Sequence, residues 1–254
     1  MFFVVGFMTV HELVFVGLSG AIAAVGAAGL LERYRIQQRT PSRSLVVACI
    51  KSLLVGHLIV QPLQLFLLYP VFVALGMSAD PADMPSAAVA IAQLLACFVI
   101  NETGFYWSHR WLHSEWLFKT VHARHHKFGS TIGIAAEYAH PFEQLVSNGL
   151  PTIGGPLLLG THMSITFLWL AIRIYLTVDN HCGFALPWSP AHWGGAAKVN
   201  PFASHPLAHN FHHSHNSGCY GGNSFFWDWI MGTDADFNHH LAAINSAEKS
   251  AKAE

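Results

Sequence analysis

The chain has 254 residues, of which 52% are hydrophobic and only 11% are charged. Soluble domains carry about a quarter charged residues, so this composition excludes an ordinary soluble protein and indicates a membrane protein. The net charge of −1 provides no basic excess for nucleic acid, and we expect no nucleic-acid partner. The four cysteines are scattered without a CxxC pair, which predicts no disulfide framework.

Three apolar segments in the first part of the chain predict membrane spans. They cover residues 13–31, 52–75 and 86–106, and each approaches the ~20 apolar residues that a spanning helix needs. We therefore assign residues 1–106 to transmembrane helices, with kinks expected at Pro62 and Pro70. The loop between the first two spans is rich in basic residues and carries five of the 13 in the chain. They are Arg33, Arg35, Arg39, Arg43 and Lys51, and the positive-inside rule places this loop in the cytosol.

A fourth uncharged run covers residues 144–172 and contains Pro151, Pro156 and a Gly-Gly pair. These helix breakers predict a membrane hairpin at about 144–178 instead of one straight helix. The hairpin lies within a proposed catalytic region at 107–240, which a frayed polar tail at 241–254 follows. The predicted fold class is all-α: a multi-pass transmembrane bundle of about four spans or span-pairs, capped by a cytosolic histidine-rich helical domain.

The chain contains 18 histidines, and many follow helical spacing. His109 and His113 form an HxxxH motif, and two HxxHH motifs begin at His122 and His209. On a helix, residues three and four apart share a face, so each motif aims several imidazoles at one point. In the first HxxHH we expect His122 and His125 to share one direction. His126 then pairs with His122 or reaches a second metal.

Together with two single histidines, these motifs give ten candidate ligands: His109, His113, His122, His125, His126, His140, His181, His209, His212 and His213. A metal takes four to six ligands, so ten imidazoles predict two metal ions with about five ligands each. We assign no catalytic side chain beyond these ligands. His205 and His215 flank the last motif and are alternative ligands. The remaining histidines, including His11, His57 and His162, are expected to pack or cap helices.

Three carboxylates lie at spacings that suit hydrogen bonds to ligand rings. Glu102 precedes His109 by two helical turns, Asp179 precedes His181, and Asp228 follows the last motif. A carboxylate that accepts the free ring N–H fixes the tautomer and orientation of a ligand histidine.

Several stretches around the histidines resemble the fatty-acid hydroxylase/sterol desaturase superfamily, and within it the C-4 methylsterol oxidases most closely. They are AEYAHP at 136–141, LPTIGGP at 150–156, VDNHCGFALPWS at 178–189 and FWDWIMGTD at 226–234. The resemblance implies a non-haem di-iron monooxygenase of the endoplasmic-reticulum membrane whose active site faces the cytosol. It also implies O2 as co-substrate, NAD(P)H electrons delivered by cytochrome b5 or a reductase, and oxidation of a sterol C-4 methyl group.

Other functions share the same histidine pattern. The HHSHN segment at 212–216 resembles sterol side-chain hydroxylases, and a sterol C-5 desaturase or another lipid hydroxylase would also fit. A membrane metal transporter or sensor is the alternative of a different class. Transport sites lie at mid-membrane on broken helices, whereas these motifs follow a span or lie in polar segments.

Overall fold

The structure is a computed structural model that describes residues 1–189 and 206–251. Its elements are α1 (Phe2–Ala27), η1 (Glu32–Tyr34), α2 (Arg43–Val55), η2 (Gly56–Val60), α3 (Gln61–Ala74), η3 (Pro81–Asp83), α4 (Ala87–Leu112), α5 (Glu115–Thr120), η4 (His122–Lys127), η5 (Gly133–Glu137), α6 (Pro141–Glu143), η6 (Gln144–Gly149), α7 (Leu150–Leu159), α8 (Met163–His181), α9 (Pro206–His215), α10 (Phe226–Met231) and α11 (Ala235–Ala251). Within the described ranges, β pairing is limited to one isolated bridge between Arg35 and Phe184. The predicted all-α fold class is confirmed.

Among the described residues, three helical stretches are long and apolar enough to cross a membrane: Phe2–Ala27, Arg43–Ala74 and Ala87–Leu112. The first begins well before the expected residue 13, because the polar side chains of His11 and Glu12 find partners inside the bundle. It ends at Ala27, two residues before a glycine in the left-handed region. The chain is therefore an integral membrane protein with several passes.

The second span combines three elements into one long rod. The Ser42 hydroxyl caps α2 by accepting the Leu45 N–H at 3.3 Å. The π-helical turn η2 then joins α2 to α3, and Pro62 stands in the first turn of α3. Pro70 lies inside α3.

The predicted hairpin is present as α7 and α8, but its turn is not at the prolines. Pro151 and Pro156 both lie within α7, and the chain reverses at Gly160. Gly160 has a φ of 53°, and a Cβ there would lie 2.5 Å from the Leu75 carbonyl oxygen, so only glycine fits. His162 then caps α8 by accepting the Ser164 N–H. That this hairpin lies in the membrane remains a prediction.

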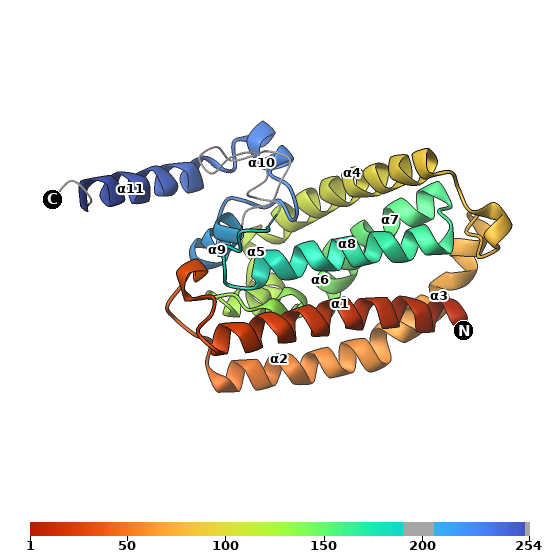
Figure 1. The fold of residues 1–254 in the computed structure, drawn as a ribbon, viewed down its shortest axis with the longest axis horizontal. Coiled ribbons are helices and arrows are strands. Elements are labelled where there is room, and N and C mark those ends of the chain that lie inside the picture. The colour runs from red at the N-terminus through yellow and green to blue at the C-terminus, as the bar shows by residue number, and fades with distance from the viewer. Residues whose placement is uncertain (190–205, 252–254) are drawn as a thin grey trace.

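In the view of Figure 1, α4 lies at one side of the bundle and α2 at the other. A core of Phe3, Phe7, Phe15 and Leu170 joins α1 to α8. The approach of α7 to α4 depends on Gly155, where a Cβ would lie 2.7 Å from the Cys97 Cα. The Gly-Gly pair therefore sets helix packing instead of breaking the helix.

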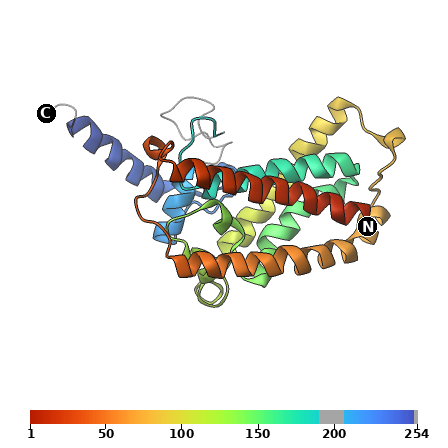
Figure 2. The same cartoon turned by 60° about the horizontal axis from the view of Figure 1, so that its bottom comes forward.

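The C-terminal ends of α4 and α8 meet α5, η4 and α9 at one end of the bundle, opposite the amino terminus, and α11 extends away from that end (Figures 1 and 2). The basic loop after α1 reaches the same end. Its Gln37 side chain donates hydrogen bonds to the Gly129 carbonyl at 3.3 Å and to the Asn210 side chain in α9. The arginine-rich loop and the histidine motifs therefore share one end of the molecule.

Candidate metal centre

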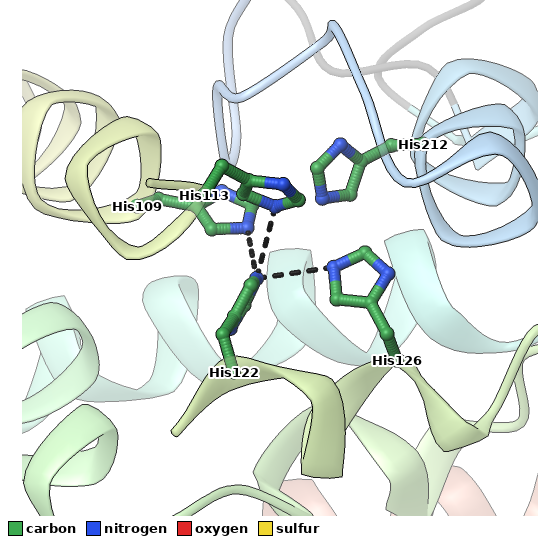
Figure 3. Close-up of side chains that lie close together, drawn as sticks. All are labelled: His109, His113, His122, His126 and His212. Carbon is green, nitrogen blue, oxygen red and sulfur yellow. Dashed lines mark hydrogen bonds between the residues drawn. The ribbon is translucent and has the colours of Figure 1, made fainter. Parts of the chain in front are cut away.

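Five imidazoles converge where α4 ends. This first histidine group consists of His109, His113, His122, His126 and His212, and each offers one ring nitrogen within 4.8 Å of the others. Figure 3 shows contacts from His109, His113 and His126 converging on the His122 ring. Its Nε2 lies 3.0 Å from Nε2 of His109 and 3.1 Å from Nε2 of His113. The Nε2 of His126 lies 3.0 Å from the same atom.

Four more imidazoles form a second group beside the first: His125, His181, His209 and His213, all buried. His181 lies in the last turn of α8. Its Nε2 is 2.8 Å from Nε2 of His209, which is in turn 3.1 Å from Nε2 of His213. The rings of His125 and His213 lie 4.6 Å apart between centroids.

Each of the two HxxHH motifs supplies ligands to both histidine groups, but the two motifs divide their rings between the groups in opposite ways. In η4, His122 and His126 join the first group and His125 joins the second. In α9, the outer pair of the motif joins the second group and His212 joins the first. This differs from the expected alignment of His122 with His125: in each motif the i, i+4 pair joins one group and the i+3 ring joins the other.

Acceptors outside the first group set the tautomers of three rings. The Nδ1–H of His109 donates to the Tyr220 carbonyl at 2.8 Å, and that of His212 donates to the Gly218 carbonyl at 2.6 Å. The Nδ1–H of His122 donates to the Glu143 carboxyl at 2.8 Å. A neutral imidazole has one N–H, so each Nε2 directs its lone pair into the group.

Lone pairs that face one another at about 3 Å repel unless a cation lies between them. Within the described residues, Nε2 of His212 is buried and has no hydrogen-bond partner. A buried polar atom of this kind is costly unless it has a ligand to bind. The donor set of the first group therefore fits a metal ion, and the facing nitrogens of the second group fit another.

Burial also keeps these rings available as ligands. It holds the pKa of His126 at about 3, far below the ordinary value near 6.5. The pKa values of other ring groups outside the spans are lowered for the same reason: His122, His125, His209, His212 and His213. The rings are neutral at pH 7. Imidazole ligands without thiolates suit iron, zinc or copper and are unlike a cysteine-based structural zinc site.

Glu143 contacts a candidate ligand and was missed by sequence reasoning. Its carboxyl accepts the Nδ1–H of His122, and burial raises its pKa well above the ordinary value. A cation on Nε2 of His122 would favour the ionised carboxylate, so metal binding would release a proton. The only sequence signal was its place just after the AEYAHP stretch, since its partner lies in a different element.

Glu102 has a different partner from the one expected. It accepts the backbone N–H groups of Asn223 and Ser224 at 2.9 and 2.8 Å, whereas the ring nitrogens of His109 face Tyr220 and His122. Glu102 thus anchors the loop that supplies the carbonyl acceptor for His109.

Asp228 fixes the same loop from its other side. It accepts the Tyr220 N–H at 2.8 Å and the Gly221 N–H at 2.7 Å. Burial raises its pKa to about 6, which leaves the carboxylate ionised at pH 7. Asp179, beside His181 in sequence, accepts the Ser189 hydroxyl at 2.6 Å.

The remaining candidate ligands lie outside both groups. The Nδ1 of His140 accepts the Phe142 N–H at 3.2 Å and caps α6. His215 is exposed and stacks on Phe211 at 4.0 Å between centroids. His205 lies outside the described residues. The structure thus brings nine of the ten predicted ligands together, five in one group and four in the other.

Comparison with known proteins adds a second line of evidence. Residues 94–233 match the family described as "Fatty acid hydroxylase". Methylsterol monooxygenase 2-1 of Arabidopsis thaliana is 37% identical over 243 residues, which cover 92% of this chain and 88% of the relative. Methylsterol monooxygenase erg25B of Aspergillus fumigatus is 31% identical over 230 residues, covering 88% of this chain and 75% of the relative.

A relative with a different printed activity is similar to nearly the same extent. Very-long-chain aldehyde decarbonylase GL1-11 of Oryza sativa subsp. indica is 35% identical over 236 residues, which cover 91% of this chain and 85% of the relative. No solved structure matches the chain. The matched region contains all nine clustered histidines.

Proposed function

Because the chain belongs to the fatty acid hydroxylase family, we propose that it is a membrane-bound non-haem di-iron monooxygenase that oxidises a C-4 methyl group of a sterol in sterol biosynthesis. The observation that carries the proposal is the pair of adjacent imidazole groups whose Nε2 atoms converge. Two relatives that are named methylsterol monooxygenases favour the sterol substrate.

The chain supplies the binding and orientation of two iron ions. The first group would hold one ion with five imidazoles, and the second would hold the other with four. Bound there, the iron ions would supply the reduction of O2 and the oxidation of an unactivated C–H bond. The protein contributes neutral rings, fixed Nδ1–H donors and a water-poor site. Burial of Leu112, Leu117 and Val121 beside the first group adds to that exclusion of water.

Several parts of the proposal concern the surroundings of the site. Electrons would come from NAD(P)H through cytochrome b5 or a reductase, and the membrane would be that of the endoplasmic reticulum with the site facing the cytosol. The basic loop that contacts α9 supports this orientation, because positive loops remain cytosolic. The first group includes His113 at the end of α4 and the second includes His181 at the end of α8, and this position at helix ends favours an enzyme over a metal transporter.

One experiment tests substrate and chemistry together. The chain is expressed in cells that lack sterol C-4 demethylation, and sterols are identified by mass spectrometry. We expect oxidation of a 4,4-dimethylsterol at C-4, and none with His212→Ala. Side-chain or ring products from cholesterol would instead identify a side-chain hydroxylase, a C-5 desaturase or another lipid hydroxylase.

Aldehyde decarbonylation is the second candidate, since relatives that carry this name are 35% identical. A long-chain aldehyde supplied to the same cells distinguishes the two. Loss of the aldehyde carbon with no sterol oxidation would overturn the proposed function.

A further inference from the structure

A third group of metal-type ligands lies inside the bundle, apart from the two histidine groups. His11 of α1, His57 of η2 and Glu137 of η5 each place a ligand atom within 4.8 Å of the others. The three residues are at most 9% exposed. His11 and His57 belong to membrane-crossing helices, where ionisable side chains are costly and usually functional.

Two carboxylates and two imidazoles close a ring of contacts in this group. The Nε2 atoms of His11 and His57 each lie 2.9 Å from one oxygen of Glu137. Their Nδ1 atoms lie 3.0 and 2.9 Å from Glu12 Oε1. Every ring nitrogen therefore faces a carboxylate oxygen, and the two carboxylates bring two negative charges into the bundle.

Either two protons or one divalent cation would balance those charges. With two protons, both rings become imidazolium ions whose centroids are only 5.0 Å apart, and like charges at that distance repel. With one divalent cation, both rings stay neutral. Each then donates its Nδ1–H to Glu12 and turns its Nε2 lone pair toward Glu137, which is the arrangement that carboxylates impose on metal-bound histidines.

Gln61 provides an independent observation. Its side-chain nitrogen lies 3.3 Å from Glu137, while its Oε1 is buried without a hydrogen-bond partner among the described residues. The oxygen and nitrogen of an amide exchange places on rotation by 180°. Rotated in this way, Gln61 would turn its unpartnered oxygen toward the group, where that oxygen could serve as a further metal ligand.

We propose that His11, His57 and Glu137 form a third metal site, which binds one divalent first-row transition ion. Two histidines and one glutamate are a common ligand set for zinc, and Gln61 completes it. The site clamps α1 and the second span to η5. This segment leads directly into α6, which carries Glu143, so the ion supports the geometry of the first histidine group without taking part in its chemistry.

Metal counting on the full chain in lipid nanodiscs tests the site. Elemental analysis should find three ions per chain in the natural protein and two in Glu137→Gln or His57→Leu. His162→Gln is the matched control: it also removes a buried histidine, one that caps α8 and belongs to none of the three groups, and should keep three ions.

Anomalous scattering or cryo-electron microscopy of the unsubstituted protein locates the ions directly and does not depend on how the variants fold. A peak between His11, His57 and Glu137 supports the site. Two ions per chain with no peak there would overturn it and leave the two-proton form. The proposed sterol activity stands or falls separately, since neither measurement depends on turnover.

Discussion

The two histidine groups differ in what holds their rings from outside. In the first, His109 and His212 donate to backbone carbonyls and His122 donates to a carboxyl. In the second, His181 donates to the Thr177 carbonyl at 2.8 Å. Within the described residues, however, Nδ1 of His209 and His213 has no hydrogen-bond partner, and in the first group the same is true of His126. Three rings of the first group are thus held by outside acceptors before an ion binds, whereas His209 and His213 of the second gain orientation from the ion.

Removing one ligand from each group should have the largest effect. We expect His212→Ala and His209→Ala each to lower oxidase turnover more than about 100-fold, beyond the 10–100-fold typical of an outer partner, because both ions are needed. Each variant should lose the ion of its own group, which elemental analysis measures. His215→Ala, an exposed neighbour outside both groups, is the control. Full turnover in either ligand variant would contradict the assignment.

Removing the Glu143 carboxyl should weaken metal binding in the first group more than in the second. Glu143→Leu leaves the Nδ1–H of His122 unpaired, and we expect the affinity of the first group for its ion to fall about 10–100-fold. Glu143→Gln keeps an acceptor and should recover most of that loss. Glu115→Gln, an exposed carboxyl paired with Lys119, controls for charge. Competition with a chelator measures both affinities, and an equal loss in both groups would refute the comparison.

Acid should destabilise the metal-free protein through its buried neutral rings. The folded-state pKa of His126 is lowered from 6.5 to about 3, so below pH 6.5 the unfolded chain binds the proton more readily. Stability is therefore present above pH 6.5 and is lost as the pH falls toward 3, by about 1.4 kcal/mol per pH unit for each such ring. Thermal unfolding of the chelated protein between pH 7.5 and 5 measures the slope. A flat profile would show that the rings are not held neutral.

The smallest effect is expected at His140. Its Nδ1 caps α6, and loss of such a cap costs about 1 kcal/mol. We therefore expect His140→Ala to lower the melting temperature slightly and to keep both ions of the histidine groups. Loss of an ion as complete as in His209→Ala would instead make His140 a ligand of the second group.

Local spacing predicted much of the site. The i, i+4 spacing of His109 and His113 predicted neighbouring rings, and the structure places them side by side at the end of α4. Both HxxHH motifs likewise brought their rings to the centre. The group that each ring joins depends on which helix ends pack beside η4 and α9. This packing is tertiary structure, and local spacing does not predict it.

The outer partners were less predictable for the same reason. Helical spacing suggested Glu102 as the partner of His109, but the ring donates to the carbonyl of Tyr220, which another loop supplies. Backbone carbonyls leave no mark in a sequence. In the fold, the apolar runs predicted the three spans, whereas the hairpin turn depended on the close contact of Gly160 with Leu75.

Each HxxHH turn carries ligands for both histidine groups, and this sharing has a consequence for the order in which metal ions bind. Since η4 and α9 each carry ligands for both groups, an ion in one group orders the backbone that presents the ligands of the other. The conformational entropy of those turns is lost once, with the first ion, so the second binds more favourably than it would alone. Loading is therefore expected to be positively cooperative, and chains with a single ion should be scarce at intermediate metal concentrations.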